Sequence, residues 1–131
     1  MNWLIANIKG LMVASGVLTC TMVFAAIAPQ AALRSTFGET LEGPLADIVV
    51  RNWGALIGLV GAMLIYGAYV PPARSLALTV AGLSKVVFIG LVLAHGDRYL
   101  GRAGIPIVID LVMVVLYGAY LMATRRRAVE Q

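Results

Sequence analysis

Long apolar runs separated by short polar segments are the main pattern along this chain. A helix that crosses a bilayer needs about 20 mostly apolar residues, and four windows of that kind fit the pattern. They cover approximately residues 4–28, 48–70, 75–94 and 104–123. Pro29, the pair Pro71 and Pro72, and the segment 95–104 interrupt the runs. The pattern predicts an all-α fold, an integral membrane bundle of four transmembrane helices that forms one domain over residues 1–131.

The composition indicates that lipid is the solvent for most of the surface. Hydrophobic residues make up 61% of the chain and charged residues only 12%, whereas soluble domains carry about 25% charged residues. The single Cys20 excludes an internal disulfide and a cysteine-based metal site. The net charge of +4 is not arranged as a basic patch interleaved with aromatic residues, so we expect no nucleic-acid partner.

The charges between the apolar runs predict the orientation of the bundle. Four spans bring both termini to one side, which carries Lys9, Arg74 and three arginines at 125–127 with Glu130 as the only acid. The connections on the other side mix basic and acidic residues. Because short cytoplasmic segments carry an excess of lysine and arginine, both termini are expected in the cytoplasm.

The longest connection, residues 29–47, has a composition of its own. It contains apolar and polar residues in a mixture that suits a short helix lying in the membrane interface, followed by a turn at Gly43 and Pro44. A simple linker is the alternative, and the sequence leaves both readings open. The residues that favour a helix are Ala31, Ala32, Leu33, Arg34, Ser35 and Phe37.

One lysine lies inside the third apolar run, in the stretch GLSKVVFIGLVLAH. With 1.5 Å of rise per residue, Lys85 lies about 15 Å from the cytoplasmic face, near the midplane of the bilayer. Asp110, the one acid within a predicted span, lies about 9 Å below the outer face. An unpaired charge at mid-bilayer costs at least about 2.5–3.5 kcal/mol. We therefore expect Lys85 to pair with Asp110, and Arg51 with Asn52 to cap the outer end of the pair.

Small residues share a helix face with the charged ones. From Arg51, steps of three and four residues reach Gly54, Gly58 and Gly61, and glycines at this spacing let helices approach closely. The same steps from Asp110 lead to Tyr117. The predicted ligand or ion-pair cluster is Arg51, Asn52, Lys85, Asp110 and Tyr117, and the predicted helix-packing residues are Gly54, Gly58 and Gly61.

Two readings of this cluster remain open. In the first, the ion pair only fixes the register of the helices; in the second, it lines a cavity for a polar or anionic ligand or relays protons. Catalytic residues and metal ligands are not expected, since His95 lacks a second histidine and suits a solvated loop.

Two stretches resemble a known family. PQAALRSTFG at 29–38 and VVRNWGALIGLVGAMLIYGA at 49–68 are similar to segments of the DoxX-like group of small four-helix bacterial membrane proteins. The resemblance implies a multi-pass protein of the bacterial inner membrane. It also implies an accessory subunit or small-ligand binder, as in proteins linked to membrane-bound, quinone-using redox reactions. Cys20 alone cannot run a dithiol cycle.

Three functional hypotheses follow. The first is a non-enzymatic membrane subunit, or a module that binds a lipophilic small molecule, attached to a quinone-using redox complex; quinone or lipid would be its only bound group. The alternative is an oligomeric small transporter or channel subunit that uses Arg51, Lys85 and Asp110. The third is an architectural role in which Gly54 and Gly58 mediate assembly. All three expect a homo-oligomer or a larger membrane complex in the lipid bilayer.

Overall fold

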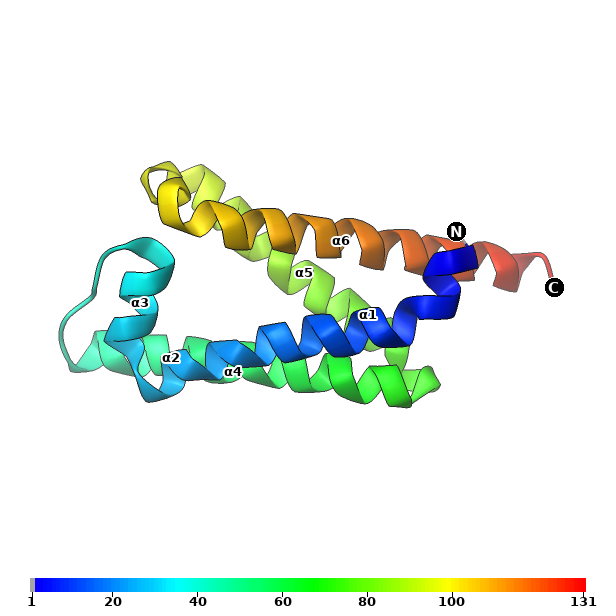
Figure 1. Cartoon of the computed structure of the whole chain (residues 1–131), viewed down its shortest axis with the longest axis horizontal. Coiled ribbons are helices and arrows are strands. Elements are labelled where there is room, and N and C mark those ends of the chain that lie inside the picture. The colour runs from blue at the N-terminus through cyan, green and yellow to red at the C-terminus, as the bar shows by residue number, and fades with distance from the viewer. Residues whose placement is uncertain (1) are drawn as a thin grey trace.

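A computed structural model describes residues 2–131 of the chain, and every regular element in this range is a helix (Figure 1). Four helical segments are long and apolar enough to cross a membrane, at residues 2–27, 44–69, 71–95 and 97–129. The predicted all-α fold with four spans is confirmed at this level. The elements in order are α1 (Asn2–Cys20), η1 (Thr21–Val23), α2 (Phe24–Ile27), α3 (Pro29–Phe37), α4 (Pro44–Tyr69), α5 (Pro71–His95), η2 (Asp97–Tyr99) and α6 (Leu100–Val129).

The helices are longer than the sequence pattern predicts. Proline is well placed at the first position of a helix, where its missing N–H has no partner to lose, so α4 begins at Pro44 and α5 at Pro71. Gly101 and Gly104, expected as helix breakers, lie inside α6. That expectation is wrong because a helical glycine costs only about 1 kcal/mol. Each unpaired backbone group in a bilayer costs several kcal/mol, so the chain stays helical there.

Successive helices of the bundle pack against one another. Span one (α1, η1 and α2) packs along α4, α4 packs against α5, and α5 packs against α6. Val70 is the single non-helical residue between α4 and α5. Both chain termini lie at the same end of the long axis as the α4–α5 turn, while α3 lies at the other end (Figure 1). We call these the terminal end and the α3 end.

Glycines bring span one and α4 into backbone contact. A Cβ atom added at Gly61 would lie 2.7 Å from the backbone nitrogen of Cys20 and 2.7 Å from the carbonyl oxygen of Gly16. One added at Gly54 would lie 2.7 Å from the backbone nitrogen of Ala26, and one at Gly58 would collide with the side chain of span one beside it. The glycine face is therefore filled by span one of the same chain. The hypothesis that Gly54 and Gly58 join subunits is wrong for this reason.

The terminal half of the bundle is closely packed. Met12, Leu64 and Leu78 are completely buried there, one from each of span one, α4 and α5. Tyr117 of α6 is also buried, and its hydroxyl donates a hydrogen bond to Oγ of Ser15, 2.7 Å away. Because the hydroxyl groups of Tyr117 and Ser15 bond to each other, their burial leaves neither of them without a hydrogen-bond partner.

α3 closes the opposite half. It begins with Pro29 and ends at Gly38, whose positive φ of 79° gives the left-handed conformation common after a helix. In Figure 1 it runs crosswise to the long helices. The ring of Phe37 lies 6.1 Å from that of Trp53 on α4 and 6.4 Å from that of Phe88 on α5, centroid to centroid. The segment after span one is thus a helix and not a simple linker.

Candidate functional site

The predicted ion pair between α5 and α6 is present. Nζ of Lys85 lies 2.6 Å from Oδ1 of Asp110, and the two side chains are 10% and 20% exposed. Lys85 lies ten residues before His95, and Asp110 ten residues after Leu100, so both stand about 15 Å from the α3 end. The expected axial offset between them is absent because α6 begins before residue 104. The two charged residues therefore lie at the same depth in the bundle.

The ion pair lies in the wall of a cavity of about 240 Å³. Every span contributes to the cavity, and Thr36 of α3 lines it as well. Most of the wall is apolar, and hydroxyl groups from three threonines and one serine accompany the charges. The lining residues are Leu18, Thr19, Thr21, Met22, Thr36, Trp53, Ile57, Val60, Ala81, Ser84, Lys85, Phe88, Pro106, Ile109 and Asp110.

Two of the helices that line the cavity are irregular beside it. Span one tightens into the 3₁₀ turn η1 at Thr21–Val23, and such a turn within a long helix often accompanies a functional site. Pro106 lies inside α6, one turn before Asp110. It has no N–H to donate to the carbonyl oxygen of Arg102, so that oxygen loses its usual helical partner. The backbone is thus least regular where the cavity lies.

A second hollow adjoins the cavity on the side of α4 and α5. It is an apolar groove of about 360 Å³ at the α3 end, and Trp53 and Phe88 line both hollows. His95, the last residue of α5, is exposed and borders this groove. The aromatic rings around Phe37 therefore stand between an open apolar groove and the cavity with the ion pair.

Arg51 and Asn52 do not belong to this site. Nη1 of Arg51 donates to the carbonyl oxygens of Ala26, at 2.7 Å, and Ile27, at 3.3 Å. Span one ends there because Pro29 disfavours a helical conformation at Ala28, whose φ and ψ are −130° and 74°, so the last carbonyls of the span need another donor. Asn52 is exposed, and neither side chain lines the cavity. The expected capping of the ion pair by Arg51 and Asn52 is wrong for this reason.

Tyr117 is also separate from the ion pair. It shares the helix face of Asp110 but bonds to Ser15 in the packed terminal half, and it does not line the cavity. Of the five residues in the predicted cluster, the structure brings together Lys85 and Asp110 only.

Sequence reasoning missed most of the apolar wall. Pro106 offered a signal, since a proline one turn before the only acid of a span places both on one face. Ser84, next to Lys85, offered another. Trp53 and Thr36 gave none, because their positions depend on how α3 folds back over the bundle.

The cavity offers two charged groups within a largely apolar wall. No group of three or more His, Cys, Asp or Glu side chains that could hold a metal ion exists within residues 2–131. Lys85 offers an N–H donor and Asp110 an acceptor, within a wall that suits apolar groups. Comparisons with protein-family models, curated proteins and solved structures found no match to this chain.

Proposed function

We propose that this protein binds a small, largely apolar molecule with one polar group inside the membrane, without performing catalysis. The observation that carries the proposal is the cavity of about 240 Å³ with Lys85 and Asp110 in its apolar wall. Ligand sites in proteins combine an apolar wall with a few convergent polar groups in this way. A carbonyl or hydroxyl group on the ligand would bond to the ion pair. A quinone ring meets this description, as does a short lipid fragment.

The ligand would reach the site from the bilayer. The apolar groove between α4 and α5 adjoins the cavity and shares Trp53 and Phe88 with it. A molecule dissolved in lipid could enter this groove and pass the ring of Phe37 by a rotation of side chains. A lipophilic ligand suits this route better than a water-soluble one.

Conduction is the less favoured function. Met12, Leu64, Leu78 and Tyr117 fill the terminal half of the bundle, so one chain offers no continuous polar path from end to end. The alternative of an oligomeric transporter or channel would need a path between subunits. Lys85 and Asp110 would contribute little to such a path, because they pair with one another within one chain.

The proposed setting is the inner membrane of a bacterium, with both termini in the cytoplasm. The surplus of arginine at the terminal end supports this orientation. We further propose that the protein is a DoxX-like accessory subunit in a homo-oligomer or a larger complex that uses quinone. The crosswise placement of α3 is compatible with a position in the outer membrane interface (Figure 1).

Fluorescence of Trp53 provides the test. The chain has two tryptophans, and Trp3 is 72% exposed at the terminal end. In a Trp3→Phe variant, Trp53 becomes the single reporter, and it lines the cavity. Decylubiquinone, added to this variant in detergent micelles, is expected to quench the fluorescence in a saturable way.

The matched control is Trp53→Phe, in which Trp3 reports only the partition of the quinone into the micelle. A Ser84→Phe substitution should fill the cavity and abolish saturable quenching, whereas Ser75→Phe, on the same helix but outside the cavity, should not. The proposal would be contradicted if quenching rose linearly with concentration and with the same slope for Trp53 and Trp3. This result would have to hold both for the quinone and for lipophilic alcohols that carry a quencher.

A further inference from the structure

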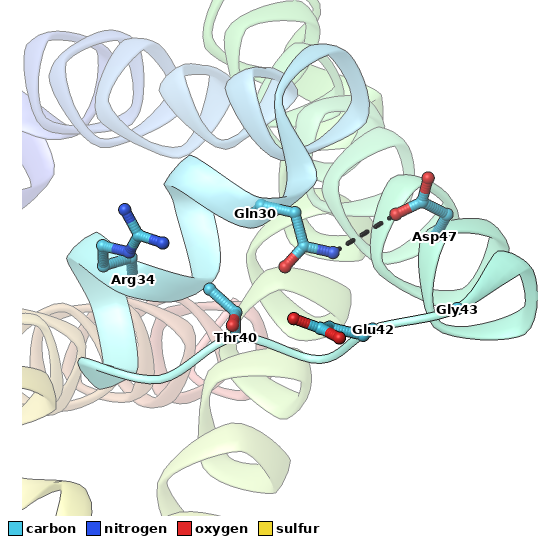
Figure 2. Close-up of a pocket in the computed structure, with 6 residues that line it drawn as sticks. All are labelled: Gln30, Arg34, Thr40, Glu42, Gly43 and Asp47. Carbon is cyan, nitrogen blue, oxygen red and sulfur yellow. Dashed lines mark hydrogen bonds between the residues drawn. The ribbon is translucent and has the colours of Figure 1, made fainter.

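A third hollow, at the α3 end, is lined by charged and polar side chains. It has a volume of about 330 Å³ and lies where α3, the following loop and the first turn of α4 meet (Figure 2). This volume is within the range of ordinary small-molecule sites. Its lining residues are Gln30, Arg34, Thr40, Glu42, Gly43 and Asp47. Lys85 and Asp110 do not line it, so a ligand bound there would not depend on the cavity between the spans.

Opposite charges line this hollow without pairing. Arg34 lies on one side and Glu42 with Asp47 on the other (Figure 2). Within residues 2–131, neither the guanidinium of Arg34 nor the carboxylate of Glu42 makes a hydrogen bond or a salt bridge. Elsewhere at this end Arg98 does pair with Glu39, at 3.0 Å. The side chains of Arg34 and Glu42 are exposed on an open hollow, so water solvates them and a ligand of mixed charge can reach them.

Gln30 links α3 to the loop and to α4 beside the hollow. Its Nε2 donates to the carbonyl oxygen of Leu41 and to Oδ1 of Asp47, the latter at 3.4 Å. Its Oε1 is buried and has no hydrogen-bond partner within residues 2–131. A buried acceptor is destabilising until a donor reaches it. Because Oε1 has almost no accessible surface, the amide contributes to the hollow by holding the loop and α4 through Nε2.

We propose that this hollow binds a zwitterion, a group that carries an ammonium and a phosphate or carboxylate a few bonds apart. Arg34 would hold the anionic group by two parallel N–H donors. The ammonium would lie between Glu42 and Asp47, whose carboxylates accept hydrogen bonds. A simple anion would meet two carboxylates, and a metal cation would meet Arg34, so neither suits the site as well.

Two sources offer this chemistry. One is the headgroup of an ethanolamine phospholipid, which the neighbouring membrane surface would supply. The other is a free zwitterion such as phosphoethanolamine. The recognition is the same for both, and the experiment separates them.

The experiment uses the full-length protein and two probes. Phosphoethanolamine is titrated by calorimetry into protein in a neutral detergent. Retention of phosphatidylethanolamine against phosphatidylglycerol is measured by native mass spectrometry after release from mixed nanodiscs. Arg34→Gln and Asp47→Asn should each weaken binding at least tenfold in whichever arm is positive. Binding of the soluble probe identifies a free zwitterion, and selective retention alone identifies the lipid.

Matched controls separate the hollow from the net charge. Arg125→Gln and Asp97→Asn change the net charge by the same amounts but lie outside the hollow, and both should bind as the parent protein does. Arg34→Lys keeps the positive charge and should lose less affinity than Arg34→Gln, which guards against an effect of misfolding. Three results would overturn the proposal: no binding in either arm, equal losses in pocket and control variants, or Ca²⁺ binding that Arg34→Gln strengthens.

Discussion

The two halves of this bundle bury their helix faces in different ways. In the terminal half, apolar side chains such as Met12 and Leu64 are completely buried, and one neutral hydrogen bond joins Tyr117 of α6 to Ser15 of span one. In the α3 half the same four spans line a partly open cavity that contains an ion pair in its wall. Close packing and the cavity therefore lie along different lengths of the same helices.

The connections explain why the halves differ. Glycines hold span one against α4, and the short η2 turn holds α5 beside α6. Only Val70 separates α4 from α5, so these two helices are held together at the terminal end. Toward the other end α5 diverges from α4 and approaches α6, and α3 lies across the opening (Figure 1). The cavity is therefore a consequence of helix pairing, and the ring of Phe37 supports it from one side.

The largest effect is expected from Gly61→Leu, which disrupts the contact between α4 and span one. Any side chain at this position meets the backbone of span one, at 2.7 Å for Cβ alone, and backbone cannot rotate away. We expect a loss of about 3 kcal/mol or more in the free energy of unfolding. The measurement is unfolding by sodium dodecyl sulfate in mixed micelles, followed by circular dichroism.

Gly90→Leu is the control for this change. Gly90 is exposed on α5, and a Cβ there has nothing within 4 Å. It should insert and unfold as the parent protein does. If both leucine variants were equally stable, the close approach of span one and α4 would not be what holds this pair together.

The next largest effect concerns the ion pair in the α3 half. Lys85→Met leaves Asp110 without its partner in a largely apolar wall, and removal of one member of a buried pair costs about 3 kcal/mol. The double variant Lys85→Met with Asp110→Leu removes both charges, and its stability should return to within about 1 kcal/mol of the parent. Unfolding in mixed micelles measures both.

The same variants separate a structural from a functional ion pair. The double variant should be stable yet fail to bind decylubiquinone in a saturable way when Trp53 is the reporter. Full binding by the double variant would leave the pair with a structural role only, and the functional reading of Lys85 would be wrong.

Much of this fold and part of the site follow from the sequence. Four apolar runs define the spans, and the cost of a lone charge in lipid leads directly to the pairing of Lys85 with Asp110. The glycine spacing likewise indicates the close contact of α4, but not with which helix. Arg51 was misplaced because its partners, the carbonyls of Ala26 and Ile27, become available only where span one breaks. Which backbone carbonyls lack a helical partner cannot be read from the side chains alone.

A smaller effect is expected at the two arginines that cap helix ends. Arg51 bonds to the end of span one in the α3 half, while Arg74 bonds to the carbonyls of Gly67 and Ala68 at the end of α4, at 3.2 and 2.8 Å. Hydrogen bonds from a charged donor contribute about 1.5 kcal/mol. Arg51→Gln should lower stability by about that amount and also weaken binding in the cavity, because the end of span one lies nearby.

Arg74→Gln should lower stability to a similar degree and leave binding unchanged, since its contacts lie at the terminal end. Arg125→Gln, an exposed arginine beyond the packed core, serves as the control for charge. Equal losses of binding in the Arg51 and Arg74 variants would show that the two halves respond as one unit.

The smallest effect is expected from Tyr117→Phe in the terminal half. The substitution removes the hydroxyl that donates to Ser15 at 2.7 Å but keeps the buried ring, which is 1% exposed. Oγ of Ser15 can still donate to the carbonyl oxygen of Met12, so the loss should be about 1 kcal/mol. Tyr66→Phe, at a tyrosine that is 60% exposed, should change nothing. Because Tyr117 does not line the cavity, quenching of Trp53 by decylubiquinone should keep the same midpoint. A shifted midpoint would mean that packing in the terminal half sets the shape of the cavity, and the division between the two halves would no longer hold.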